Sequence, residues 1–307
     1  MKIRINEVSP RDGLQSQGKT LSVESRLSLI QALVNAGLEN VEAGSFVSPK
    51  AVPQMAGTDK LFARLPDQNT VRYAGLVPNM KGYELAVSAG AKVVNVVLSV
   101  TETMNQENIR MSLLQTVEVC TAIIERGKRE GVEVQAYLAV AFECPFEGLV
   151  EPAVVARFAK LVKQAGASKI IIADTIGAAN PEHVKRLLDA VTGEVGSDIL
   201  SCHFHDTRGM ALANITVAVE HGVREFDSSI GGLGGCPFSP GATGNVATED
   251  VVLLLNSMGH DTGIDPLDLI SVVNLAEQLT GVSLGGKSFR WLSQQASKAA
   301  AEIAHGG

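Results

Sequence analysis

Two histidines separated by one residue, in His203-Phe204-His205-Asp206, are the strongest chemical signal in the sequence. The apolar run before them predicts a strand over residues 199–205, and alternate residues of a strand project from the same face. Two neutral imidazoles and one carboxylate can bind a divalent metal. Asp12, which follows the first predicted strand, is the candidate third ligand. The alternative is a pair of histidines whose hydrogen bonds are satisfied within the core or rim.

Arg11 precedes Asp12, and a neighbouring guanidinium keeps a carboxylate ionised, as a metal ligand must be. Arg11 could then bind an anionic substrate oxygen. The alternative is a rim salt bridge, for instance to Glu7. Glu42 falls inside a predicted strand over 39–44, where a charge must be paired. We expect Glu42 to hold Arg11 or a metal-bound water, although a purely structural network fits as well.

A glycine-rich segment over residues 231–245 contains Cys236. Its glycines allow close approach to a ligand or closure as a lid, and the thiol could deliver or take a proton. A connector with an incidental cysteine is the alternative. Asn245 is either the N-cap of the next helix or a fourth metal ligand. Glu249 lies one turn further along that helix and could face the same site.

Short β-branched runs alternate with helical patterns almost to the end of the chain. We expect strands at 3–8, 39–44, 71–76, 93–99, 132–140, 168–174, 199–205 and 225–230. We expect helices at 23–36, 52–65, 80–89, 106–130, 152–165, 181–193, 208–221, 244–258 and 266–280. Eight strands, each followed by a helix, predict an α/β fold of the (β/α)8 TIM barrel type, with a doubly wound open sheet as the alternative. We assign the barrel to residues 1–281 and a short helical C-terminal extension to 282–307.

In such a barrel, catalytic groups lie where strands end at their carboxyl side. The polar residues at those points are Arg11, Asp12, Gln15, Glu42, Asp174, Thr175, His203 and His205. The pattern therefore predicts one rim rich in titratable groups.

The overall composition excludes several function classes. The 307 residues include 26 basic and 33 acidic side chains, for a net charge of −7, and no basic run suggests nucleic-acid binding. No apolar run approaches the thickness of a bilayer, which predicts no membrane association. The four cysteines form no CxxC pair, as is usual in a reducing compartment, and we expect a cytoplasmic protein.

Five segments, taken together, resemble the 3-hydroxy-3-methylglutaryl-CoA lyase family of metal-dependent barrel lyases, relatives of Claisen-type condensing enzymes. They run in one order from residue 9 to about residue 255. They are Pro10-Arg11-Asp12-Gly13-Leu14-Gln15, Gly44-Ser45-Phe46-Val47-Ser48-Pro49-Lys50, Asp174-Thr175-Ile176-Gly177, His205-Asp206-Thr207, and Gly232-Leu233-Gly234-Gly235-Cys236-Pro237. The cysteine loop is that family's own signature.

The resemblance implies retro-Claisen cleavage of 3-hydroxy-3-methylglutaryl-CoA to acetyl-CoA and acetoacetate, within leucine degradation and ketone body formation. It implies a homodimer that uses Mg²⁺ or Mn²⁺ and binds an acyl-CoA substrate. The implied metal ligands are Asp12, His203, His205 and Asn245. The implied catalytic residues are Arg11, Asp12, Cys236, Glu42 and Asp174. The implied substrate contacts are Arg11, Gln15, Ser45, Thr175, Arg208 and Glu249.

Three departures from the family pattern leave the acyl group open. Arg208-Gly209-Met210 stands where the family usually has Tyr-Gly-Gln, Glu143 replaces a glycine, and residues 101–109 lack the usual Phe-Ser and lysines. A different 3-hydroxyacyl-CoA is therefore an alternative substrate.

Other reactions remain as alternatives. A condensing synthase would run the carbon–carbon bond the other way, but usually carries an added domain. A biotin-linked carboxyltransferase needs a lysine where Ala173 stands. A two-histidine, one-carboxylate iron oxygenase is a different enzyme class, and neither the barrel nor the cysteine loop suggests it. A non-enzymatic metal-stabilised barrel would leave Arg11 and Cys236 without a role.

Overall fold

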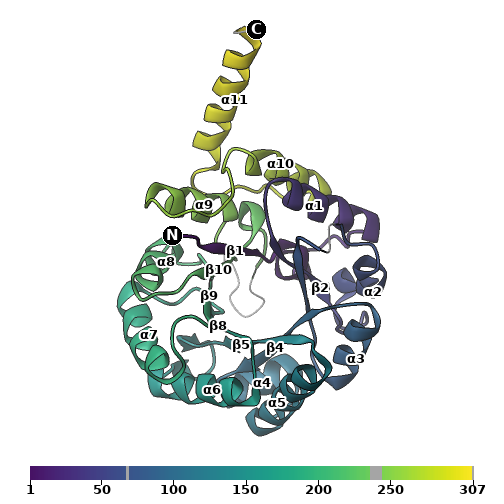
Figure 1. Ribbon diagram of the computed structural model, residues 1–307, viewed down its shortest axis with the longest axis vertical. Coiled ribbons are helices and arrows are strands. Elements are labelled where there is room, and N and C mark those ends of the chain that lie inside the picture. Colours follow the sequence, from purple (N-terminus) through teal and green to yellow (C-terminus); the bar gives the residue numbers. More distant parts are fainter. Residues whose placement is uncertain (67–68, 236–243, 306–307) are drawn as a thin grey trace.

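Eight parallel strands close into a barrel in the computed structural model, which describes residues 1–66, 69–235 and 244–305. Around the barrel they follow the order β1-β10-β9-β8-β5-β4-β3-β2, with the helices outside (Figure 1). Their bounds are β1 Arg4–Glu7, β2 Asn40–Ser45, β3 Arg72–Leu76, β4 Val93–Ser99, β5 Glu133–Ala139, β8 Lys169–Asp174, β9 Leu200–Phe204 and β10 Glu225–Ser228.

The barrel closes where the first strand meets the last. Arg4 aligns with Glu225 and Glu7 with Ser228, so β1 runs parallel to β10 on one side and to β2 on the other. The predicted (β/α)8 TIM barrel is confirmed, and the open sheet is excluded.

The surrounding helices are α1 Val23–Asn35, α2 Thr58–Phe62, α3 Met80–Ser88, α4 Glu102–Ile109, α5 Leu113–Glu130, α6 Pro152–Ala165, α7 Pro181–Val195, α8 Ala211–Glu220, α9 Thr248–Ser257, α10 Leu269–Thr280 and α11 Phe289–His305. A π-helical turn covers Ser9–Gly13, 3-10 turns cover Pro53–Met55 and Ile230–Gly232, and β6 (Glu143–Cys144) pairs with β7 (Gly148–Leu149).

Two predicted helices are divided in the structure. The single helix expected over 106–130 breaks because Arg110 adopts a left-handed conformation (φ 56°), and Ser112 then begins α5 with a capping box to Gln115. The helix expected over 52–65 is a 3-10 turn followed by α2, because Gly57 (φ 73°) separates them.

Strand β2 carries a register shift against β3 between Glu42 and Gly44. Glu42 and Ser45 are three residues apart and would face opposite sides of a regular strand. The irregularity between them changes that alternation. As a result, Glu42 lies inside the barrel against Arg11, and Ser45 lines the cavity above it.

Helix α11 points away from the barrel (Figure 1). The segment before it is attached, because Asp250 accepts hydrogen bonds from the backbone of Lys287 (2.7 Å) and Ser288 (2.8 Å). Glu249 accepts from the Gly286 N–H at 2.7 Å. The division at residue 281 remains a prediction.

Within the described part of the chain, no helix combines the length and apolarity that crossing a membrane requires.

Candidate active site

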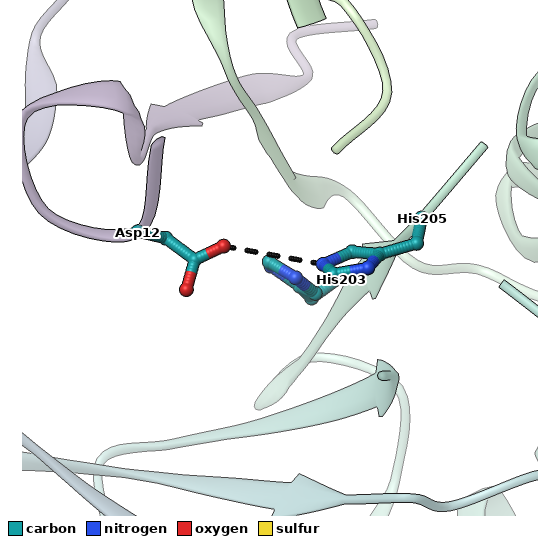
Figure 2. Close-up of side chains that lie close together, drawn as sticks. All are labelled: Asp12, His203 and His205. Carbon is teal, nitrogen blue, oxygen red and sulfur yellow. Dashed lines mark ion pairs between the residues drawn. The ribbon is translucent and has the colours of Figure 1, made fainter. Parts of the chain in front are cut away.

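Asp12, His203 and His205 meet at the carboxyl end of the barrel. One ligand atom from each lies within 4.8 Å of the others. Asp12 lies in the π-helical turn after β1, and His203 lies in β9. His205 is the first residue after the end of β9. Figure 2 shows the Asp12 carboxylate directed at the His205 ring, and Asp12 Oδ2 is 3.9 Å from His205 Nε2. The sequence-predicted trio is therefore brought together.

The Arg11 guanidinium is held between two carboxylates. Its Nε donates to Glu42 Oε2 at 2.6 Å, and its Nη1 donates to Asp12 Oδ1 at 2.5 Å. Burial opposes these charges, but Glu42 and Asp12 keep the pKa of Arg11 above its ordinary value. Burial also raises the pKa of Asp12, yet the charges of Arg11 and the histidines take it well below its usual range. Asp12 is thus ionised, as a metal ligand requires.

The predicted alternative of an Arg11–Glu7 salt bridge is wrong. Glu7 accepts hydrogen bonds from the backbone of Ser9 (2.9 Å) and Ile230 (3.0 Å) and from Thr248 Oγ1 (2.6 Å). The Glu7 carboxylate is buried beneath the rim, and these three donors satisfy it without Arg11.

The two histidines differ in their surroundings. His203 Nδ1 is 3.0 Å from Asp227 Oδ2; burial lowers the pKa of His203, but this partner raises it above the ordinary value. Burial, with the charge of His203, lowers the pKa of His205 to about 4, so its ring is neutral at pH 7. His205 Nδ1 is buried and has no hydrogen-bond partner among the described residues. The reading as two hydrogen-bonded histidines therefore fails for His205.

The donor set fits a divalent cation. Two imidazoles and an ionised carboxylate suit Mn²⁺ and similar ions, while Mg²⁺ favours oxygen. Asn245 adds to the fit, because its Oδ1 is buried with no partner among the described residues. Its Nδ2 donates to Asp12 Oδ2 at 2.8 Å, so the amide already lies beside the trio.

Asn245 is not a helix N-cap, because α9 begins at Thr248 with Ala247 as its cap. Instead, it forms an isolated bridge with His205. That bridge aligns its side chain with the candidate ligands, which leaves the metal-ligand alternative.

A cavity of about 390 Å³ opens above the trio. Besides Asp12 and the histidines, its lining includes four other predicted residues, which are Arg11, Gln15, Ser45 and Thr175. An apolar wall is formed by Val47, Val52, Val77, Met104 and Ile109. Ser45 Oγ is buried without a hydrogen-bond partner in the described part of the chain, which suits a polar group of a ligand.

Among the described residues, three predicted site residues neither line this cavity nor hydrogen-bond to Arg11 or Asp12, and these are Asp174, Arg208 and Glu249. Asp174 accepts from the N–H groups of Ala178 (2.8 Å) and Ala179 (3.1 Å), and burial raises its pKa to about 6. Arg208 pairs with Glu143 at 3.2 Å on the outer rim.

Glu249 accepts from the N–H groups of Gly231 (3.0 Å) and Gly286 (2.7 Å), and burial raises its pKa to about 7. Cys236 lies outside the described residues, but Gly235 before it lines the cavity.

Sequence reasoning missed Asp227, Tyr137 and Asn95, which support the site from below. Tyr137 donates to Asp227 Oδ2 at 2.6 Å, and Asn95 donates to Glu42 Oε1 at 2.7 Å. The argument that selected Glu42, a charge inside a barrel strand, applies equally to Asp227 and could have found it.

The chain is similar over most of its length to known proteins. The HMGL-like family model matches residues 2–276. Hydroxymethylglutaryl-CoA lyase of Pseudomonas mevalonii is 41% identical over 94% of this chain and 98% of its own. The 3-hydroxy-3-isohexenylglutaryl-CoA/hydroxy-methylglutaryl-CoA lyase of Pseudomonas aeruginosa is 41% identical over 96% of this chain and 98% of its own.

A solved structure of an HMG-CoA lyase from Acinetobacter baumannii, in complex with coenzyme A and 3-methylmalate, superimposes with a TM-score of 0.89 at 38% identity, and each chain is covered to 94%. The family match over residues 2–276 spans the barrel strands and the sequence from Arg11 to Glu249. This chain therefore belongs to the HMGL-like family and is an HMG-CoA lyase-type barrel enzyme.

Proposed function

We propose that the protein cleaves 3-hydroxy-3-methylglutaryl-CoA by a retro-Claisen reaction, giving acetyl-CoA and acetoacetate. One observation carries the proposal: Asp12, His203 and His205 converge beside a buried Arg11 at the mouth of the barrel. Its relatives carry the same activity in their names.

Asp12, His203 and His205, with Asn245 as a fourth partner, would hold Mg²⁺ or Mn²⁺. Such a cation would lower the pKa of the substrate's tertiary hydroxyl and offset charge that develops as the carbon–carbon bond breaks. The lowered pKa values of Asp12 and His205 leave these two donors deprotonated at pH 7. His203, whose pKa Asp227 raises, would release a proton when the cation binds.

Arg11 would stabilise the developing enolate oxygen of the acetyl-CoA half. Its Nε and Nη1 are bound to Glu42 and Asp12, while Nη2 has no acceptor among the described residues. The guanidinium is therefore held in place before substrate binds, and one of its edges is left for a substrate oxygen. A preorganised donor of this kind lowers the free energy of a transition state in which negative charge develops.

Cys236 would protonate the carbanion, directly or through a water. The support is its place in the sequence, between Gly235, which lines the cavity, and Asn245, which contacts Asp12. For the base that removes the hydroxyl proton, the candidates are Asp12, Asp174, a histidine or a water. The loop N–H groups that hold Asp174 argue against it.

A second candidate is the same cleavage of a 3-hydroxyacyl-CoA with a longer apolar branch at C3. The apolar wall of Val47, Val52, Val77, Met104 and Ile109 favours it, since such a branch needs a dry surface. The name of the Pseudomonas aeruginosa relative includes such a substrate.

The test is the rate of acetyl-CoA release from 3-hydroxy-3-methylglutaryl-CoA with Mg²⁺ or Mn²⁺, with EDTA, and in Cys236→Ala. We expect release to stop with EDTA and to fall about 100-fold or more in Cys236→Ala, with metal still bound. The control is Cys120→Ala, because Cys120 is buried on α5. Metal-loaded, folded protein that releases nothing would reject this substrate, and the isohexenyl analogue would then be tried.

A homodimer and a cytoplasmic location remain predictions from the sequence. Size-exclusion chromatography with light scattering tests the first.

A further inference from the structure

Asp227 is the immediate neighbour of a candidate metal ligand across the sheet. It lies on β10 in register with His203 on β9, and its Oδ2 is 3.0 Å from His203 Nδ1. The Asp227 side chain is 1% exposed and that of His203 is 7% exposed. The contact is thus shielded from water, which strengthens it.

Asp227 is itself fixed from two other strands. Tyr137 on β5 donates to its Oδ2 at 2.6 Å, and Asn6 on β1 donates to its Oδ1 at 2.9 Å. A carboxylate held by donors from β1 and β5 has a fixed orientation, so it can impose an orientation on the imidazole.

We infer that Asp227 is a positioning residue that places the proton of His203 on Nδ1 and leaves Nε2 to bind the cation. A carboxylate only accepts hydrogen bonds, so a neutral ring facing it must donate from Nδ1. The lone pair then lies on Nε2, the nitrogen that remains for the metal site. The inference rests on the proposed metal-dependent function.

The matched variants are Asp227→Asn and Glu225→Gln. Asparagine has nearly the same size as aspartate, and its amide can still hydrogen-bond to the Asn6 amide if both side chains turn. Unlike a carboxylate, however, this amide can present an N–H donor to His203. Glu225 is two residues earlier on β10 and is buried, and it pairs with Arg4 and Lys169, each at 3.2 Å. Its replacement removes a buried carboxylate for which no contact with a candidate ligand is found among the described residues.

We expect Mn²⁺ binding, followed by electron paramagnetic resonance or calorimetry, to weaken about 10- to 100-fold in Asp227→Asn. Glu225→Gln should stay within twofold of the unmodified protein. In the metal-free protein at a pH where the imidazoles are neutral, nitrogen-15 NMR should assign the His203 proton to Nδ1, and Asp227→Asn should shift it toward Nε2.

Equal Mn²⁺ affinity in Asp227→Asn and the unmodified protein would overturn the inference, as would equal losses in both variants. A His203 proton on Nε2 in the unmodified protein would also overturn it. That measurement needs no variant, so it still tests the inference if Asp227→Asn does not fold. Absence of Mn²⁺ binding by the unmodified protein would instead reject the proposed function.

Discussion

Arg11 is the residue whose chemistry depends most on its exact shape. Its planar guanidinium meets Glu42 and Asp12 at the same time and still has Nη2 for a substrate. A lysine has a point charge and cannot make both contacts in that geometry.

We therefore expect Arg11→Lys to lower kcat about 100- to 1,000-fold while Mn²⁺ affinity changes only a few-fold. Steady-state kinetics and Mn²⁺ titration measure the two quantities. Arg64→Lys is the control, since Arg64 pairs with Glu24 on the surface. A kcat within tenfold of the unmodified enzyme would remove Arg11 from the proposed role.

At this scale, much of the site could be predicted from sequence. The spacing of His203 and His205 and the proximity of Arg11 to Asp12 are local features, and the structure brings all four together. Asp227 could have been selected as a charge inside a strand, but its contact with His203 depends on β9 and β10 being neighbours. Tyr137 was missed because its contact with Asp227 joins β5 and β10, which are not adjacent in the barrel. The role of Cys236 stays a prediction.

Among the elements, the segments that follow β5 and β9 are joined by two of the residues that depart from the family pattern. Arg208 pairs with Glu143 at 3.2 Å, with side chains 48% and 26% exposed. An ion pair this exposed contributes about 1 kcal/mol or less. Because Arg208 is occupied at the rim, it does not line the cavity.

We expect Arg208→Ala to change kcat/KM by less than about threefold, and a double-mutant cycle with Glu143→Ala to give a coupling of about 1 kcal/mol or less. Urea unfolding and steady-state kinetics provide both values. A tenfold rise in KM would indicate that Arg208 reaches the substrate, as the sequence suggested.

Helix α9 connects the glycine-rich loop to the C-terminal segment through Glu249. Burial raises the pKa of Glu249 from 4.5 to about 7, so the folded protein holds this proton more tightly than the unfolded chain. Between these pH values the unfolded chain binds fewer protons, and the free energy of unfolding must fall as pH rises.

Glu249→Gln cannot titrate, so the stability of the unmodified protein relative to this variant should fall by an amount on the order of 3 kcal/mol between pH 4.5 and 7. Urea unfolding with EDTA at both pH values measures the difference. Asp174, whose pKa is about 6, is present in both proteins and cancels. If the difference in the free energy of unfolding between the two proteins is the same at both pH values, the two backbone donors keep Glu249 ionised.

On the scale of the whole molecule, the alternation of strands and helices predicted the TIM barrel, since that pattern is repeated eight times. The breaks at Arg110 and Gly57 were not predicted, because single left-handed residues leave little trace in hydrophobic periodicity. The attachment of residues 285–288 was missed for a different reason, as its partners are backbone N–H groups.

That attachment predicts different outcomes for two truncations. A chain ending at Ser288 keeps the N–H donors to Glu249 and Asp250, whereas a chain ending at Gly281 leaves both carboxylates without them. We expect the shorter chain to melt roughly 5–10 °C below the longer one, because hydrogen bonds to charged groups are lost. Equal melting temperatures, measured by calorimetry, would support the division at residue 281.

The pairing of β1 with β10 also determines when the residues of the proposed metal site can come together. Asn6 and Asp227 are hydrogen-bonded across 221 positions of chain, and Asp12 leaves the ribosome long before the histidines do. Until β10 is made, β1 and β9 present unpaired edges, which are prone to aggregation. With Asp12 and the histidines as the proposed ligands, a chain that ends before β10 would lack the paired strands that hold Asp12 near His203 and His205. We therefore expect cation binding only after the barrel closes.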